Sequence, residues 1–288
     1  MECRLINMPD PIFRPLFDFH QDGFHSEGKR SYQMIPVGGE RTLKLMRAPG
    51  VVFKTSPTTE PIPESEAHRR CIWSESGQTI QEPRIIRLRG VSHGNAYYTS
   101  IIPGNCLEFL TTFVRRRKYV RVAFHFVSDI EGHRTVRGQG IISKAVARLN
   151  EILTPQANLD FKIAGVRNVQ VPEDLGCLIG GESEALCQEE WGKIVKLGDP
   201  SSDWNVFFVW DMRHSTAGDQ VLAANKRQNC LVDDMTSSEQ LGNVLAHEYC
   251  HSQGCGHVEG NQSQFLMNEY EAGGTWLRMS DLLKVNSL

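Results

Sequence analysis

The chain has 288 residues, of which 40% are hydrophobic and 23% are charged, as in ordinary globular proteins. Its formal net charge of −3 gives no general attraction to nucleic acid, so we expect no nucleic-acid partner. No apolar run is long enough to span a bilayer, and the first residues lack the basic segment and apolar core of a secretory signal.

The 8 cysteines are scattered along a long chain rather than arranged as a compact disulfide framework. This pattern favours free thiols that pack as small hydrophobic side chains. We therefore expect the protein to be made in a reducing cytoplasm.

Residues 1–30 hold prolines, phenylalanines and histidines without a period, which predicts an irregular N-terminal arm. Residues 31–116 show short apolar runs separated by Gly, Pro and Ser, which predicts an all-β sandwich. The predicted strands cover 41–46, 51–55, 71–74, 85–89, 95–102 and 106–114, with a loop over 56–67.

Within this region, residues 87–98 read Arg-Leu-Arg-Gly-Val-Ser-His-Gly-Asn-Ala-Tyr-Tyr. This segment resembles the penultimate hairpin of bacterial immunoglobulin-like domains. The resemblance implies an immunoglobulin-like sandwich over residues 31–116. Such a domain would act as a spacer or recruit a targeting partner.

The run Arg-Arg-Arg-Lys at 115–118 marks the start of a second domain, over residues 117–288. An isolated basic run between domains is usually a solvated linker rather than a nucleic-acid site. Apolar patterning predicts strands over 119–127, 159–163, 166–171, 205–210, 218–224 and 229–233.

One amphipathic helix is predicted after residue 141 and ends at Thr154-Pro155. Its apolar stripe consists of Ile142, Ala145, Val146, Leu149, Ile152 and Leu153. A long insertion covers residues 172–200 and contains a helix-like stretch over 184–195. Three further histidines, His125, His133 and His214, stand alone, and each is expected to be structural or exposed.

The strongest chemical signal is His-Glu-Tyr-Cys-His-Ser-Gln-Gly-Cys-Gly-His at residues 247–257. Upstream, Thr236 and Glu239 have the spacing of a helix capping box. On the helix that follows, His247 and His251 are one turn apart and point the same way, as two imidazoles that share a zinc ion must.

Gly254 can adopt a positive φ and end the helix, so that the chain turns back and delivers His257 as a third ligand. Three protein ligands leave a fourth position of zinc open for water, which is the catalytic arrangement. Glu248 lies beside the two helical histidines, where it can reach that water. The pattern predicts one catalytic Zn2+ ion.

Residues His247, Glu248, His251, Gly254 and His257 resemble the extended zinc motif of the metzincin metallopeptidases. The resemblance implies an α+β catalytic domain, a mixed twisted sheet with an active-site helix, over residues 117–288. It also implies a methionine turn beneath the metal. Met267 is the candidate for that turn, and an ordinary core methionine is the alternative.

In this family the edge strand before the zinc helix binds the substrate as an additional strand. The resemblance assigns that edge to Gln220, Val221, Leu222, Ala223 and Ala224. It also suggests a substrate or metal contact for Tyr270, although Tyr270 stands three residues after Met267 where relatives have two. Val258, after the third histidine, fits none of the common subfamily residues, so the subfamily stays open.

The resemblance implies a zinc endopeptidase that acts on protein or peptide substrates, with Glu248 as the proton acceptor. A peptidase made in the cytoplasm must be narrowly specific, kept inactive, or exported by a leaderless route as an effector or toxin. Two alternatives remain open. One is a zinc-stabilised binding protein with Cys250 or Cys255 as a fourth ligand, and the other is a hydrolase of a non-peptide amide.

Overall fold

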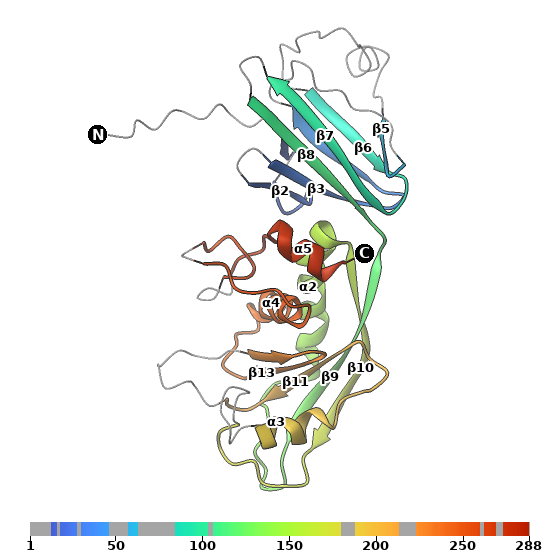
Figure 1. Cartoon of the computed structure of the whole chain (residues 1–288). Coiled ribbons are helices and arrows are strands. Elements are labelled where there is room, and N and C mark those ends of the chain that lie inside the picture. The colour runs from blue at the N-terminus through green and yellow to red at the C-terminus, as the bar shows by residue number, and fades with distance from the viewer. Residues whose placement is uncertain are drawn as a thin grey trace, which may run out of the picture. The chain divides into compact units, whose positions relative to one another are not determined.

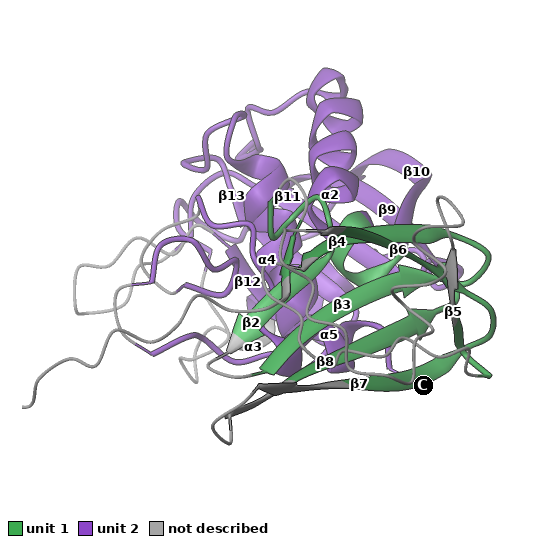
Figure 2. Cartoon of the chain, turned by 90° about the horizontal axis from the view of Figure 1, so that it is seen from above, with its two compact units in different colours: residues 1–117, 155–158, 288 green, residues 118–154, 159–287 purple. Residues whose placement is uncertain are grey.

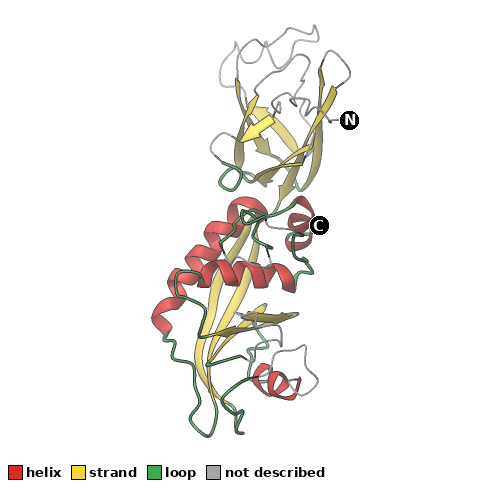
Figure 3. Cartoon of the chain, turned by 90° about the vertical axis from the view of Figure 1, so that its left-hand side faces the viewer, coloured by secondary structure: helices red, strands yellow, loops and turns green. Residues whose placement is uncertain are grey.

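The computed structural model describes residues 13–15, 18–27, 30–45, 57–62, 84–102, 106–179, 188–212, 223–259, 262–268 and 273–287. Two compact units divide the chain (Figure 2). The first comprises residues 1–117, 155–158 and 288, and the second comprises 118–154 and 159–287. Helices and strands are both present, so the described chain is of mixed α and β structure (Figure 3).

The first unit contains two four-stranded sheets (Figure 1). One sheet has the order β1 (Phe13–Pro15), β4 (Glu40–Leu45), β6 (Arg84–Gly90) and β5 (Thr59–Ile62). The other has the order β2 (Phe24–Glu27), β3 (Arg30–Pro36), β8 (Cys106–Arg115) and β7 (Gly94–Ile102). Neighbouring strands are antiparallel except β3 and β8, which are parallel.

Apolar side chains of both sheets share one core. Ile35 and Leu110 come from the second sheet and Leu43 and Leu88 from the first, and all four are fully buried. Because successive side chains of a strand point to opposite faces, each sheet can bury one face in this core. The all-β character predicted for residues 31–116 agrees with these strands, and membership of the immunoglobulin-like family stays a prediction.

Three local predictions for this unit are wrong. Residues 13–15 and 24–27, expected in an irregular arm, form β1 and β2, because β1 pairs with the distant β4 and β2 pairs with the next strand, β3. Residues 59–62, expected in a loop, form β5. This strand lies at the edge of its sheet, and an edge strand tolerates a proline such as Pro61 because one side of it need not donate to a neighbour.

The third concerns residues 87–98, which were expected to form a hairpin. β6 pairs with β4 and β5, whereas β7 pairs with β8, so the two strands belong to different sheets. The short link between them therefore crosses from one sheet to the other. The strands predicted over 51–55 and 71–74 lie outside the described residues.

The second unit is built on a five-stranded sheet of order β10-β9-β11-β13-β12. Its strands are β9 (Lys118–Ser128), β10 (Leu159–Gln170), β11 (Trp204–Val209), β12 (Ala223–Lys226) and β13 (Asn229–Asp233). The first four in spatial order are parallel, and β12 is antiparallel at the edge. The single strand β10 replaces the two predicted over 159–171, with an irregularity between Ile163 and Gly165.

The helices of this unit are η1 (Gln139–Ile141), α2 (Ile142–Ala157), α3 (Gln188–Val195), α4 (Leu241–Ser252) and α5 (Met279–Val285). On one face of the sheet, Tyr249 of α4 meets Phe161 and Trp204 edge-on, at ring-centroid distances of 4.7 and 5.5 Å. On the other face, Phe207 and Val209 share a core with Trp191 and Ile194 of α3. No helix among the described residues is long and apolar enough to cross a bilayer.

All members of the apolar stripe predicted for α2 are buried. The predicted end of the helix is wrong, because α2 continues through Pro155 to Ala157. A proline in the last turn removes only one helical hydrogen bond, and its fixed φ suits a helix. The helix ends instead where Asn158 takes a φ of 52°, the left-handed conformation that asparagine tolerates after a helix.

Helix α4 begins later than the capping box at Thr236 predicts. Residues 237–240 first form a turn in which Gln240 N donates to Ser237 O (3.1 Å) and to Ser237 Oγ (3.2 Å). One turn further, Gly242 lets α4 approach α2 closely. A methyl group at Gly242 would lie 2.4 Å from Arg148 Cβ and 3.0 Å from Ala145 O.

This close approach predicts that Gly242→Ala destabilises the second unit by about 1–3 kcal/mol, because α2 and α4 must move apart. Gly192 is a matched control in α3, since a methyl group there meets no atom within 4 Å. Gly192→Ala should stabilise by roughly 0.5–1 kcal/mol through its lower chain entropy. Urea unfolding of both variants measures the difference, and equal effects would contradict the close packing.

Candidate metal centre

The end of α4 reverses the chain at Gly254, which has a φ of 83°. Gly254 N donates to His251 O (2.8 Å), and Cys255 N donates to Cys250 O (3.0 Å). These two bonds form a Schellman motif, which satisfies carbonyl groups at the helix end. The reversal brings His257 back beside the histidines of the helix.

Three ring nitrogens meet at one point of the structure. His251 Nε2 lies 2.9 Å from His247 Nε2 and 3.0 Å from His257 Nε2. His247 Nε2 and His257 Nε2 are 3.3 Å apart. The three expected ligands are thus assembled, with His257 exposed and the other two partly buried, so that the centre is open to solvent on one side.

Carbonyl oxygens fix how two of these rings are protonated. His247 Nδ1 lies 2.7 Å from Leu266 O, and His251 Nδ1 lies 2.9 Å from Cys255 O. A carbonyl only accepts hydrogen bonds, so each Nδ1 carries the proton and each Nε2 presents a lone pair.

Lone pairs 2.9 Å apart repel each other unless a cation lies among them. Nitrogens bound tetrahedrally to zinc, at about 2.0–2.1 Å each, are separated by roughly 3.3 Å, close to the distances found here. The residues present therefore fit a zinc ion.

Burial keeps the helical histidines neutral. Burial and, to a smaller extent, the neighbouring His251 lower the pKa of His247 to about 4. Burial is also the main cause that lowers the pKa of His251. The neutral imidazole is the form that binds a metal, so these environments favour the ligand state at neutral pH.

Glu248 follows His247 on α4 and is buried, with 8% of its surface exposed. Burial raises the pKa of its carboxyl to about 8. Such a carboxyl accepts a proton more readily than an ordinary glutamate does.

The segment around Met267 contacts the site through its backbone. Leu266 O holds the ring of His247, and Met267 O accepts a hydrogen bond of 2.8 Å from Val258 N, next to His257. The side chain of Met267 is fully buried. The segment after the third histidine therefore supports the ligands on two sides, whereas a role of the methionine side chain itself stays a prediction.

Arg278 is a positioning residue that sequence reasoning missed. Its guanidinium donates to Gly256 O (2.6 Å) and His257 O (3.3 Å) and forms a two-pronged ion pair with buried Asp281 (2.7 and 2.9 Å). The only sequence signal is the complementary charge pair three residues apart at the start of α5. Lys284 Nζ also donates to Gly254 O (2.8 Å).

The expected substrate edge is only partly described. Ala223 and Ala224 lie in β12, the edge strand, which extends to Lys226. Gln220, Val221, Leu222 and Tyr270 lie outside the described residues. The hairpin to β13 turns at Arg227, whose φ is 56°, and no Gly or Asn there signals this turn.

No family model matches the chain, and no curated protein matches it. Archaemetzincin from Methanopyrus kandleri is similar over 58% of this chain and 86% of its own, with a TM-score of 0.37 and 13% identity. A zinc-dependent peptidase from Methanocorpusculum labreanum matches over 58% of this chain and 100% of its own, with a TM-score of 0.37 and 10% identity. Metalloproteinase-II from Bacteroides fragilis matches over 90% of this chain and 98% of its own, again with a TM-score of 0.37 and 10% identity. Likeness at this level carries no argument about activity, which depends on the geometry of the chain itself.

The contacts of Arg278 predict that Arg278→Met weakens zinc binding by roughly 10- to 100-fold, the usual effect of losing a group that orients a ligand. Competition with a chromophoric zinc chelator measures the affinity. Arg148→Met is the matched control, because Arg148 lies between α2 and α4 and contacts none of the three histidines. Equal affinities of the two variants would contradict the positioning role.

Glu248 gives a pH prediction for the metal-free protein. Its pKa is about 8 in the folded chain against an ordinary 4.5, so the unfolded chain releases the proton first as the pH rises. The contribution of Glu248 to folding stability should therefore fall between these two values, by up to about 1.4 kcal/mol per pH unit, whereas His247 contributes in the opposite direction below pH 6.5. Glu248→Gln should lack this fall. Urea unfolding in the presence of a chelator measures it, and parallel pH curves for both proteins would refute the assignment.

Proposed function

We propose that the chain is a zinc-dependent endopeptidase that cleaves protein or peptide substrates. The observation that carries this proposal is the triangle of ring nitrogens of His247, His251 and His257, open to solvent on one side and adjacent in the chain to buried Glu248. When bound, a zinc ion at the triangle would lower the pKa of a water and polarise the carbonyl of a peptide bond.

The remaining chemistry belongs to residues of the chain. The three histidines hold the metal as neutral ligands, with His247 and His251 oriented through their Nδ1 protons. Glu248 accepts a proton from the attacking water and returns it to the nitrogen of the leaving amine. Burial makes this carboxylate a stronger proton acceptor than an ordinary glutamate.

The edge strand β12 would bind the substrate. It is unpaired on one side within the described sheet, and helix α4 lies against it. A peptide that adds to this edge gains main-chain hydrogen bonds, and the small side chains of Ala223 and Ala224 leave room beside it. The proposal extends the binding edge to Gln220, Val221 and Leu222, and includes Tyr270.

A purely structural zinc site is the less suitable alternative. Among the described residues, no fourth histidine, cysteine or carboxylate joins the three ring nitrogens. The buried thiol of Cys255 instead faces Asp281 O at 3.9 Å, and Cys250 lies beside Cys255. A closed four-ligand site has no donor here, and it would have no use for Glu248.

Two further parts of the proposal concern the whole protein. The first unit would act as an immunoglobulin-like module that binds a targeting partner, since it has its own core. The proposal also includes delivery of the peptidase as an exported effector.

Glu248→Gln tests the proposed role directly. One zinc per chain should remain bound, because the three histidines are unchanged, and peptide cleavage should fall by roughly 10²- to 10⁴-fold or more. Zinc content by atomic emission and mass-spectrometric mapping of new N-termini in a digested proteome are the two measurements.

Glu239→Gln is the matched control, since Glu239 is exposed before α4 and should leave both quantities unchanged. Unreduced cleavage by the Glu248 variant would refute the role. The map of new termini also separates peptide cleavage from hydrolysis of a side-chain amide.

A further inference from the structure

A second group of reactive side chains lies at the carboxyl-terminal ends of the parallel strands. β9, β10 and β11 are parallel, so the segments after their last residues meet at one edge. These segments supply Asp129 and His133, Asp174 and Cys177, and Trp210. The candidate metal centre lies toward the amino-terminal ends of the strands. Lys118, the first residue of β9, donates to Gln253 (3.4 Å), which follows α4 and precedes Gly254.

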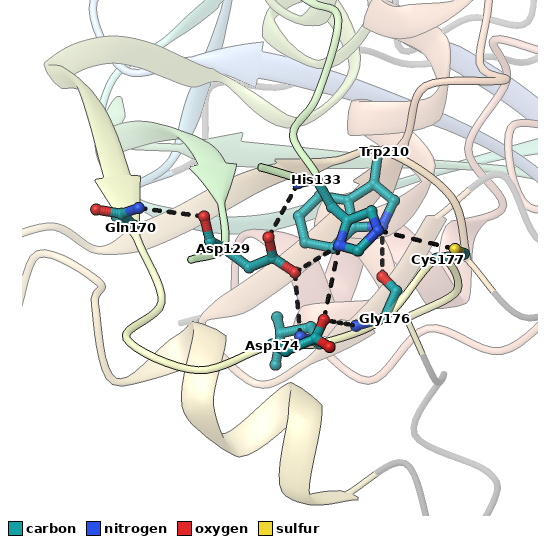
Figure 4. A network of polar contacts seen from close by, with 8 residues as sticks. Asp129, His133, Gln170, Asp174, Gly176, Cys177 and Trp210 are labelled. Atoms are coloured by element: carbon teal, nitrogen blue, oxygen red, sulfur yellow. Dashed lines mark hydrogen bonds and ion pairs between the residues drawn. The ribbon is translucent and has the colours of Figure 1, made fainter. Parts of the chain in front are cut away.

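Three of these residues form a chain of contacts (Figure 4). His133 Nδ1 lies 2.8 Å from Asp129 Oδ2, and His133 Nε2 lies 3.7 Å from Cys177 Sγ. The thiol of Cys177 is exposed, whereas the carboxyl of Asp129 is buried. Nucleophilic catalysis uses such an arrangement, in which a base lies beside the nucleophile and a third group orients the base. Here these would be Cys177, His133 and Asp129.

The base is held in one orientation. Asp129 Oδ1 accepts from His133 N (2.9 Å), and Asp129 Oδ2 accepts from Leu175 N (3.1 Å). Because a carboxylate accepts from Nδ1, Nε2 presents its lone pair to the sulfur. The ring of Trp210 stacks on His133 at 5.8 Å, and its Nε1 donates to Gly176 O (3.1 Å), next to Cys177.

A metal site explains this geometry less well. An ion held by His133 Nδ1, Asp129 and Asp174 would leave Cys177 out, because the sulfur lies at Nε2 of the same ring. Both oxygens of Asp129 already accept hydrogen bonds from N–H groups. Asp174 is 3.7 Å from His133 Nδ1, and its Oδ1 accepts from Gly176 N (2.7 Å). These contacts position a base rather than surround a cation.

We propose that Cys177, His133 and Asp129 form a nucleophilic thiol site that accepts acyl groups from thioesters. Cys177 Sγ attacks the carbonyl carbon, so that a new sulfur–carbon bond forms while the carbon–sulfur bond of the donor breaks. The thiol proton passes to His133 Nε2 and then to the departing sulfur, and the acyl group remains on Cys177.

The charges near His133 and the exposed apolar side chains beside the site both favour this reaction. Asp129 is the main cause that raises the pKa of His133, and Asp174 and Glu131 act in the same direction, which makes the imidazole a stronger proton acceptor. Ile130 and Leu178, the chain neighbours of Asp129 and Cys177, expose 53% and 41% of their surfaces. They provide apolar surface for the hydrocarbon part of an acyl group.

The test uses the full zinc-loaded chain with acetyl and octanoyl thioesters of N-acetylcysteamine. Peptide mass spectrometry follows acylation of Cys177 over time. We expect His133→Gln to lower the rate by about 100-fold, the usual contribution of a positioned base. Glu173→Gln is the matched control, because Glu173 pairs with Lys193 of α3 rather than with His133, and it should leave the rate unchanged.

Chemical rescue keeps the test independent of folding. Added imidazole should restore acylation in His133→Ala, which removes the ring beside Trp210. The buried thiols of Cys230 and Cys250 report on folding, since they should stay unmodified in every variant. Equal rates with and without His133 would show an ordinary exposed thiol, and a rate that changes when further zinc is added to the zinc-loaded chain would show a second metal site. Either result overturns the proposal.

Discussion

The reversal of the chain at Gly254 is the constraint on which the metal centre depends. Its left-handed conformation ends α4 in a Schellman motif, which brings His257 toward the helix and places Cys255 O on the ring of His251. One turn thus supplies the third ring nitrogen of the candidate centre and orients the second ring. Arg278 and Lys284 then hold the reversed segment by its carbonyl groups, so that three ring nitrogens stay close although their lone pairs repel.

The parallel sheet organises the rest of the second unit. Its aromatic side chains pack against Tyr249 of α4. The neighbouring Glu248 is buried, and this burial raises the pKa of its carboxyl. The segments that carry Cys177, His133 and Asp129 lie together at the carboxyl-terminal ends of the sheet's strands. Arg137 links the segment that holds Asp129 and His133 to the segment before α4. It donates to Asp233 O (2.8 Å) and pairs with Asp234 (3.2 Å).

Local patterns predicted local structure well. The stripe of α2, the buried strand β11 and the helix with His247 and His251 follow from spacing alone, because a period of one turn or two residues fixes which side chains share a face. Predictions failed where a partner distant in sequence decides the outcome. Residues 59–62 form a strand because they pair with β6. β6 and β7 do not pair with each other, because β6 pairs with β4 and β7 pairs with β8.

The linear order of residues thus determined which side chains can bind a metal and that Gly254 permits their convergence, since both depend on contacts within about three turns of chain. The tertiary structure alone decided what holds them: Leu266 O on His247, and Arg278 on the segment of His257. It alone brought His133 to Cys177, which stand 44 residues apart. Spacing carries no signal for such pairs, because parallel strands join their ends only after the sheet has formed.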